Sequence, residues 1–482
     1  MPPSPSLRPQ GAEPPIRDRG DACPGALRLH SAADGHLARV RLPAGDLTVR
    51  QAETLADAAG RLGDGRLSLT SRGNAELRGL PESCGGQLAA LLRDAGLLPS
   101  ERHERIRNIL ASPLAGLDRH TAADVRLWAR ELDGLLCASE SATALSGRFL
   151  FVLDDGRGDV AALGGDVSLV AEAAGPGAPT AHEDASGAGR PAGSGATALL
   201  RVGDDPDALR IAGPDAPRAA LTAAEAFLTA AGSSGSGAWR IRELPDGHGL
   251  TARTVADRLH AAGIGAVLVA GTAAGTHTAA ADSSAPGVVE GRDGARALSV
   301  LAPLGRLSVA QWRLLTAIAA EDGAGALRLT PWRGIVVPGL SAATAAARLR
   351  ELSAAGLVTA PDSPWHRIGA CTGRPGCAKS RTDVRADATA AVTAGTPVPG
   401  PGPVSAARPG PGEPEPADAA LRHLPVYWSG CERRCGHPHG AWVDVLATAE
   451  GYRVSVVRPE TAPAPHPAPP AAPSAAPSPA TS

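Results

Sequence analysis

Hydrophobic and polar residues follow two different periods in the first hundred residues, and together these periods predict a strand–helix–strand–strand–helix unit. The stretch HLARVRLP (36–43) alternates with a period of two, which is typical of a strand with one buried face. LTVRQAETLADAAGRLG (47–63) has apolar residues at helical spacing, and LSLTSRGNAELRGL (67–80) has a hairpin-like pattern. Residues 83–96 are expected to form the closing helix.

This unit occurs twice, at a constant offset of 260 residues. The matched pairs include Pro43 and Pro303, Gly45 and Gly305, Gln51 and Gln311, and Thr70 and Thr330. An alanine-rich composition alone would not keep one offset through glycine, proline, glutamine and threonine. Two copies related by a pseudo-twofold axis would form a seam, which is a favoured place for a ligand. The alternative is a duplicated structural unit without a functional seam.

The composition adds long segments that cannot form a core. Glycine and proline contribute 58 and 44 of the 482 residues, and they concentrate between the regular patterns. The predicted organisation is a disordered N-terminus (1–20), a first half domain (21–99), an α/β domain (100–271) with a disordered insert (173–197), a linker (272–286), a second half domain (287–360), a cysteine-bearing domain (361–458) with a disordered insert (395–416), and a disordered Pro/Ala tail (459–482).

The overall charge is close to neutral, with 47 basic and 49 acidic residues. No global field therefore attracts the chain to nucleic acid or to an anionic membrane, and an anion site must be local. The chain has no run of 18 apolar residues, and its start, MPPSPSLRPQ, does not resemble a signal peptide. We expect a cytoplasmic protein with no membrane or nucleic-acid partner.

Four of the seven cysteines form two pairs in glycine-rich turns. ACTGRPGCAKS has five residues between Cys371 and Cys377, and SGCERRCGHPHG has three between Cys431 and Cys435. Four thiolates can hold one metal centre, and the five-residue gap favours an iron–sulfur cluster over tetrahedral zinc. Buried thiols without a metal remain an alternative.

The other three cysteines, Cys23, Cys84 and Cys137, are scattered along the chain and are expected to be packing residues. His437 and His439 follow Cys435 on either side of Pro438 and could bind a mononuclear iron. Histidines in such a loop are more often surface residues, so they are not assigned as ligands.

The paired cysteines, on the second half of a duplicated chain, resemble the [4Fe-4S] signature of the nitrite and sulfite reductase superfamily. RVRLPAGDLT, LTSRGNAELRG (69–79) and RIRNILASPLAG (105–116) are similar to N-terminal motifs of that superfamily. The resemblance implies an α+β fold, in which two ferredoxin-like half domains combine with two α/β domains in a pseudo-twofold arrangement. In the sirohaem members, the cysteine corresponding to Cys435 also bridges to the sirohaem iron.

Within this superfamily, ACPG near the start, ILASPLAGLD and RLTPWRG (328–334) resemble the precorrin-3B synthases of aerobic cobalamin biosynthesis. That resemblance implies O2-dependent hydroxylation of precorrin-3A at C20, with closure of a γ-lactone. It also implies a [4Fe-4S] cluster that relays electrons to a possible mononuclear iron, rather than a sirohaem. The electrons would come from a ferredoxin or an NAD(P)H-dependent reductase.

Arginines in the first copy are candidates for binding the carboxylates of such a macrocycle, because guanidinium groups match carboxylates bidentately. Arg39 and Arg41 are two residues apart on one predicted strand, and Arg72 and Arg78 flank the hairpin. The corresponding positions in the second copy are Ser299, Leu301, Trp332 and Pro338. The motif resemblance adds Arg107 and Arg148. Solvated strand-end arginines are the alternative for any one of them.

One motif departs from the reductases. Where they have two lysines two residues apart, GRFLF (147–151) has Arg148 and Leu150, so a basic donor for sulfite or nitrite is missing. This departure favours the macrocycle oxidase over a sirohaem-dependent nitrite or sulfite reductase. A non-enzymatic, zinc-stabilised binding module is the second alternative. Arg328 is expected to contribute little to affinity, with Trp332 filling the space that Arg72 occupies in the first copy.

Overall fold

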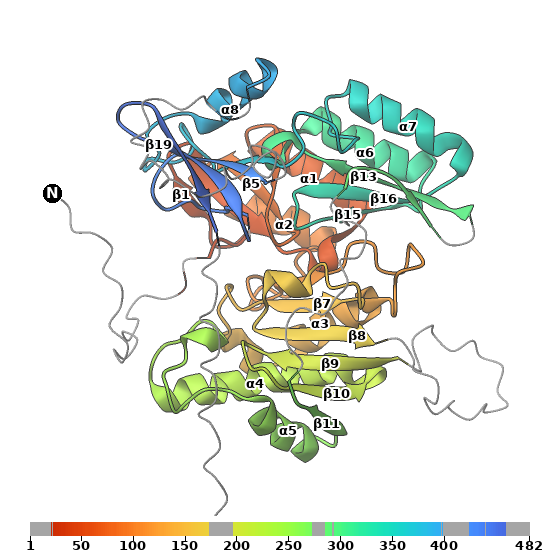
Figure 1. Ribbon diagram of the computed structural model, residues 1–482, viewed down its shortest axis with the longest axis vertical. Helices are drawn as coiled ribbons and strands as arrows, with labels where there is room; N and C mark the ends of the chain where they lie inside the picture. Colours follow the sequence, from red (N-terminus) through yellow and green to blue (C-terminus); the bar gives the residue numbers. More distant parts are fainter. Residues whose placement is uncertain are drawn as a thin grey trace, which may run out of the picture.

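The computed structural model describes residues 21, 23–172, 196–271, 285–291, 294–396, 398, 424–438 and 440–458. The segments predicted to be disordered, together with the linker 272–286, lie wholly or mostly outside these residues. Figure 1 shows two half domains side by side, an α/β domain beneath them, and a smaller blue sheet beside the first half domain. No helix in the described ranges is long and apolar enough to cross a membrane.

The first half domain has the predicted order of elements. A capping box at Thr48 and Gln51 starts its first helix, and alanines and leucines at helical spacing bury one helix face. The elements are β1 (His30–Ala32), β2 (Gly35–Val40), η1 (Pro43–Gly45), β3 (Asp46–Thr48), α1 (Val49–Leu62), β4 (Arg66–Leu69), β5 (Ala75–Leu80), η2 (Glu82–Cys84) and α2 (Gly85–Asp94).

The second half domain repeats this order, including the capping box, which is formed by Ser308 and Gln311. Its elements are β12 (Gly287–Glu290), β13 (Arg296–Leu301), η8 (Pro303–Gly305), β14 (Arg306–Ser308), α6 (Val309–Glu321), β15 (Ala326–Leu329), β16 (Gly334–Leu340) and α7 (Ala342–Ala354). The predicted duplication of the fold is confirmed.

The halves exchange a short strand that the sequence patterns did not reveal. The sheet orders are β1-β2-β5-β4-β14 and β12-β13-β16-β15-β3, so each sheet ends in a strand from the other half. The exchange is reciprocal, because the Val49 amide donates to the Gly325 carbonyl at 3.1 Å and the Val309 amide donates to the Gly65 carbonyl at 3.0 Å. The halves also share one continuous hydrophobic core.

The α/β domain has a six-stranded mixed sheet in the order β11-β10-β9-β8-β7-β6. Strands β6, β7 and β8 are parallel, and the other neighbours are antiparallel. Its elements are β6 (Ile109–Ala111), α3 (Val125–Ala138), η3 (Ser141–Ala144), β7 (Phe151–Asp154), η4 (Ala161–Leu163), β8 (Val167–Glu172), β9 (Thr197–Val202), β10 (Ala208–Ala212), η5 (Gly213–Asp215), α4 (Ala216–Ser234), η6 (Ile241–Glu243), α5 (Ala252–Ala261) and β11 (Ala266–Val269).

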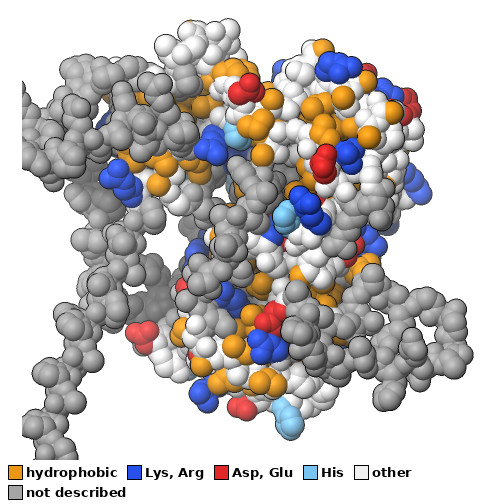
Figure 2. Space-filling model, turned by 45° about the vertical axis from the view of Figure 1, so that its right-hand side comes forward, with side chains coloured by type: hydrophobic (Ala, Val, Ile, Leu, Met, Phe, Trp, Pro, Cys, Tyr) orange, Lys and Arg blue, Asp and Glu red, His pale blue; other side chains and the backbone are white. Residues whose placement is uncertain are grey.

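The cysteine-bearing region is a smaller four-stranded sheet in the order β17-β18-β19-β20, packed against one helix. Its elements are β17 (Ile368–Ala370), α8 (Val384–Thr393), β18 (Val426–Ser429), β19 (Trp442–Ala447) and β20 (Tyr452–Val457). Strands β17, β18 and β19 are parallel, and β20 is antiparallel to β19. Basic and acidic side chains are interspersed on the face shown in Figure 2, as the nearly balanced charge predicts.

Candidate iron–sulfur and anion-binding site

The parallel pairing of β17 and β18 brings the two cysteine pairs together. Cys371 directly follows β17 and Cys431 lies two residues after β18, and the carboxyl ends of parallel neighbours meet at one edge of a sheet. The Cys371 amide donates to the Trp428 carbonyl at 3.0 Å, which continues the ladder into the loop. The Gly430 amide donates to the Cys371 Sγ at 3.2 Å.

All four cysteines line one cavity of about 520 Å³. Its opposite wall comes from the first half domain, through residues 30–33, Leu37 and Arg78. Among the described residues, no three cysteine sulfurs lie within 4.8 Å of one another. A single tetrahedral zinc would hold its sulfurs about 3.8 Å apart, given Zn–S bonds of about 2.3 Å. The donor set therefore fits a polynuclear cluster, with one iron per sulfur, better than a single zinc.

The environment of the sulfurs also suits a cluster. Burial raises the pKa of the Cys371 thiol, while the amides of Gly430 and Gly373 lower it by pointing at the sulfur. Gly430 cannot carry a side chain here, because a Cβ would lie 1.9 Å from the Ser380 Oγ. This close approach explains why the turn after β18 has glycine.

The loop that carries Cys435 is held by two residues that the sequence analysis did not single out. The Tyr427 hydroxyl donates to the Cys435 carbonyl at 2.6 Å, and Arg333 Nη2 donates to the Gly436 carbonyl at 2.7 Å. Burial raises the pKa of Tyr427 to about 12, so this donor keeps its proton. LPVYWSG is a mostly apolar run whose strand is buried throughout, so nothing in the sequence indicated that Tyr427 faces the loop.

His437 stacks on Trp442 with ring centroids 5.2 Å apart, and its Nδ1 lies 2.8 Å from the Pro438 carbonyl. His439 lies outside the described residues.

Three of the predicted arginines lie close enough to repel one another. Burial lowers the pKa of Arg41 to about 9, with further lowering from Arg39 and Arg72. Burial, followed by Arg240 and Arg39, lowers the pKa of Arg72 to about 10. Such a set of cations favours an anion nearby.

The three arginines differ in how their donors are used. Arg41 is buried and donates to the Arg105 carbonyl, Asn108 Oδ1 and the Gly147 carbonyl, at 3.1, 2.9 and 2.8 Å. It therefore joins the half domain to the α/β domain. Arg39 pairs with Glu76 at 3.0 Å. The guanidinium of Arg72 has no hydrogen bond or ion pair within the described part of the chain, which leaves it the best placed of the three to bind a ligand.

Arg78 and Arg107 use their donors within the protein. Arg78 binds Asp34 at 3.0 and 2.9 Å and donates to the Gly376 carbonyl at 2.9 Å, so it holds the first half domain against the cysteine loop. Arg107 is buried and binds Asp133 bidentately at 2.6 and 2.7 Å. Neither geometry leaves a guanidinium free for substrate.

Arg148 is exposed and lies over the Trp239 ring, 4.8 Å from its centroid. The adjacent departure, Leu150, is buried in an apolar cluster on the α/β domain. Trp332 packs against the same cluster, so the wall opposite the second half domain is apolar.

Arg328 has a structural role, which is compatible with the expected small contribution to affinity. It is buried, and its Nη1 donates to the carbonyls of Pro113 and Ala115 at 2.7 and 2.9 Å. Burial lowers its pKa to about 10. Arg328 is therefore a joint between the second half domain and the α/β domain, and its removal would destabilise the fold rather than leave it unchanged.

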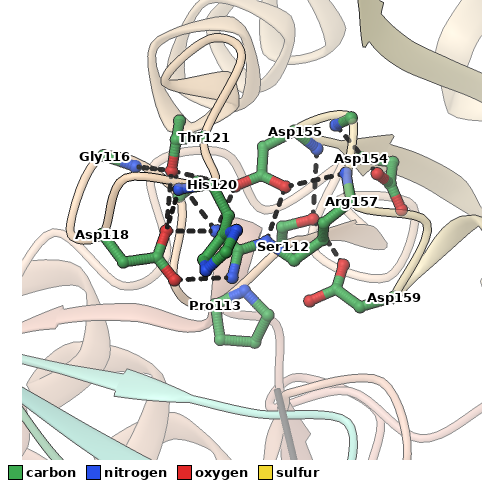
Figure 3. A network of polar contacts seen from close by, with 12 residues as sticks. Ser112, Pro113, Gly116, Asp118, His120, Thr121, Asp154, Asp155, Arg157 and Asp159 are labelled. Carbon is green, nitrogen blue, oxygen red and sulfur yellow. Dashed lines mark hydrogen bonds and ion pairs between the residues drawn. The ribbon is translucent and has the colours of Figure 1, made fainter. Parts of the chain in front are cut away.

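An acidic group that the sequence analysis missed lies at the end of β7 and in the loop that follows it (Figure 3). Asp154 accepts hydrogen bonds from the backbone amides of residues 156, 158, 160 and 161. Asp155 accepts from Arg157 and Thr121. The oxygens of Asp154 and Asp155 are thus already used to hold the loop, and the group gives no support for a metal site.

Asp159 belongs to the same group and accepts from the Ser112 hydroxyl at 2.6 Å (Figure 3). Burial, followed by the charge of Asp154, raises its pKa to about 7.

Comparisons with known proteins agree with this architecture. The model of the nitrite/sulfite reductase ferredoxin-like half domain matches residues 30–95 and again residues 289–355. A precorrin-3B synthase from Sinorhizobium sp. is 27% identical over 439 residues, which cover 91% of this chain and 83% of that protein. A ferredoxin–nitrite reductase from Synechococcus elongatus is 33% identical over 127 residues, which cover 25% of each protein.

Among solved structures, the NirA protein of Mycobacterium tuberculosis matches with a TM-score of 0.64 and 17% identity, over 87% of this chain and 74% of that one. This likeness concerns the fold. The chain has the duplicated ferredoxin-like half domains of the nitrite and sulfite reductases, and its predicted resemblance to that superfamily is confirmed.

Proposed function

We propose that the protein is a precorrin-3B synthase, which hydroxylates precorrin-3A at C20 with O2 and forms the γ-lactone. The observation that carries this proposal is the similarity to a precorrin-3B synthase along 91% of the chain. The matches to nitrite reductases, by contrast, cover about a quarter of the chain or less.

We propose that Cys371, Cys377, Cys431 and Cys435 hold a [4Fe-4S] cluster. Their shared cavity, the wide spacing of the sulfurs and the amides directed at Cys371 support this cofactor over zinc. When bound, the cluster supplies single electrons to the reaction. The ligands of a mononuclear iron are not assigned. The carboxylate oxygens of Asp154 and Asp155 already accept hydrogen bonds within their loop, which argues against an iron bound by Asp154, Asp155 and Asp159.

The macrocycle would lie beside the Cys435 loop, where the protein offers both apolar and basic surface. A cavity of about 380 Å³ there is lined by residues that include Ser71, Leu163, Trp332, Arg333 and His437. Arg72 follows Ser71 in the chain and does not itself line this cavity, so we propose that its guanidinium, which has no hydrogen bond or ion pair within the described residues, binds a carboxylate at the edge of the macrocycle. The apolar side chains of Leu163 and Trp332 would contact the macrocycle, and Arg72 would orient it.

The reaction requires two electrons and two protons from outside the substrate. One oxygen atom of O2 becomes the hydroxyl group on C20, and the acetate oxygen closes the γ-lactone on the neighbouring ring carbon, so the double bond between these two carbons is consumed. The other oxygen atom leaves as water. We expect an external donor, either a ferredoxin or an NAD(P)H-dependent reductase. The apolar wall at Leu150 and Trp332 supports this oxidation over sulfite or nitrite reduction, which needs basic proton donors at the substrate.

The test is turnover of precorrin-3A by the reconstituted full chain under ¹⁸O2. We expect one labelled oxygen in the tetrapyrrole and no product under anaerobic conditions. Sulfite and nitrite, supplied with the same reductant, should be reduced poorly. Brisk reduction of either anion without tetrapyrrole oxidation would overturn the proposal in favour of a sirohaem reductase.

A further inference from the structure

A second cavity, of about 600 Å³, lies on the other side of the cysteine loop. It shares Arg78, Thr372 and Gly376 with the cysteine cavity, so the segment between Cys371 and Cys377 separates the two spaces. Its walls come from both half domains, from the cysteine loop and from the start of α8.

Cationic side chains dominate this cavity. Five arginines and three aspartates line it, namely Arg66, Arg78, Arg306, Arg374 and Arg385 with Asp34, Asp64 and Asp383.

The three carboxylates already have partners. Asp34 is bound by Arg78, Asp64 is bound by Arg306, and Asp383 accepts hydrogen bonds from the amides at the start of α8. Two of the three carboxylates are thus neutralised by arginines, and Asp383 is the one carboxylate of this wall whose charge faces the other three arginines.

The remaining three arginines, Arg66, Arg374 and Arg385, have no carboxylate partner within the described part of the chain. Arg374 Nε donates to the Ser380 carbonyl at 2.8 Å, and Arg385 Nε donates to the Cys371 carbonyl at 3.0 Å. Each of these two hydrogen bonds uses one nitrogen of a guanidinium, which leaves the terminal nitrogens of both groups without a hydrogen bond or ion pair to the described residues.

Uncompensated guanidinium groups around a cavity are a recognition surface for carboxylate or phosphate, which they bind in a fork geometry. We propose that this cavity binds a small polyanion bearing carboxylate or phosphate groups, with Arg385 as its main contact and Arg66 and Arg374 on the surrounding walls. This site is separate from the proposed macrocycle site and does not depend on the proposed reaction.

The contact between Arg385 and Cys371 gives the site a consequence for the cysteine loop. An anion that draws the terminal nitrogens of Arg385 into the cavity also fixes the Nε that holds the Cys371 carbonyl. Occupancy of the cavity would therefore order the loop between Cys371 and Cys377.

The test is calorimetric titration of the full chain with inorganic phosphate and, separately, with citrate. The buffer contains about 0.1 M chloride, which screens charges that lie more than about 10 Å apart. We expect saturable binding at one site, weakened about tenfold or more by Arg385→Met and severalfold by Arg66→Gln. Tighter binding of citrate would indicate a carboxylate ligand, and tighter binding of phosphate a phosphorylated one.

The matched control is Arg350→Met, which removes the same charge from an exposed position on α7, away from the cavity. It should leave both affinities unchanged. Because Arg385→Met removes a contact to the cysteine loop, Arg66→Gln provides an independent variant on the opposite wall. Absence of binding, equal affinity in Arg385→Met, or an equal loss in Arg350→Met would overturn the proposal. Each result is read from binding and leaves the test of precorrin-3A turnover unaffected.

Discussion

The two half domains have the same strand order and exchange equivalent strands, yet they present different chemistry to the rest of the molecule. The first half covers the cysteine cavity through Arg78 and offers the unpaired Arg72. At the position of Arg72, the second half has Trp332, which packs on an apolar wall. The backbone has thus stayed symmetric where it carries the shared core, while the charged surface has specialised in one copy.

The asymmetry extends to the pseudo-twofold axis itself. Trp312 corresponds to Ala52 at the 260-residue offset, and its indole Nε1 donates to the Ala52 carbonyl at 2.8 Å. The large side chain of Trp312 is thus buried against the small residue Ala52 of the other half. Departures from symmetry at the axis therefore serve packing, and we propose that the departure at the β4–β5 turn, where Arg72 corresponds to Trp332, serves ligand binding.

The largest effect is expected from the cysteines, which belong to the region after the second half. Serine at Cys371, Cys377, Cys431 or Cys435 removes one ligand of the proposed cluster and should abolish most of its iron, sulfide and visible absorbance. Cys84→Ser is the matched control, because Cys84 is buried in the first half and lines no part of the cysteine cavity. Full iron and sulfide content in all four variants would rule out this ligand set.

The next effect concerns the axis between the halves. Trp312→Ala leaves a cavity in the shared core, because the side chain is fully buried, and should lower the free energy of unfolding by about 3–5 kcal/mol. Chemical denaturation measures this loss. Trp239→Ala, at a partly exposed tryptophan outside the half domains, should cost clearly less. A loss below about 1 kcal/mol for Trp312→Ala would show that the axis is not a tightly packed joint.

A smaller effect is expected at Arg72, which lies in the turn between β4 and β5 of the first half, where the second half has Trp332. Arg72→Met should weaken macrocycle affinity about tenfold to a hundredfold, as expected for the loss of one charge-assisted contact. Arg72→Trp, which gives the first copy the residue of the second, should do the same. Equilibrium binding of the tetrapyrrole under anaerobic conditions measures both variants.

Arg61→Met, at an exposed position on α1, is the control for charge and should bind normally. An equal loss in this control would mean that the asymmetry of the arginines reflects solvation and not ligand binding.

The duplicated fold could be predicted from the sequence because local periodicity and one constant offset specify each half. The exchanged strands β3 and β14 could not, since each has three residues and its pairing depends on the partner half. The cysteines were identifiable because their spacing is itself a chemical pattern.

The arginines show the limit of sequence reasoning at the site. Arg41, Arg78 and Arg107 are basic residues in matching motifs, but whether a guanidinium meets a substrate or a backbone carbonyl depends on distant chain. Arg78, for example, reaches a carbonyl 298 positions away. The structural contacts of Arg328 with the carbonyls of Pro113 and Ala115 could not be predicted for the same reason.

A pH-dependent effect tests the α/β wall on which the second half packs. Asp159 has its pKa raised to about 7, so its protonated form is favoured in the folded state. The folded protein then retains a proton that the unfolded chain loses near pH 4, and this contribution to stability declines as the pH rises from about 4 to about 7. Asp159→Asn cannot ionise, so its unfolding free energy relative to wild type should increase over that range by about 4 kcal/mol, which is about 1.4 kcal/mol for each pKa unit between the folded and unfolded states.

Denaturation of both proteins between pH 4 and 8 measures this difference, with Asp257→Asn, at an exposed position on α5, as the control. A constant difference between Asp159→Asn and wild type would mean that Asp159 is ionised throughout. The α/β surface that contacts the second half would then carry a negative charge beside the apolar cluster on which Trp332 packs. The two halves would then differ less in the polarity of the surfaces that they contact.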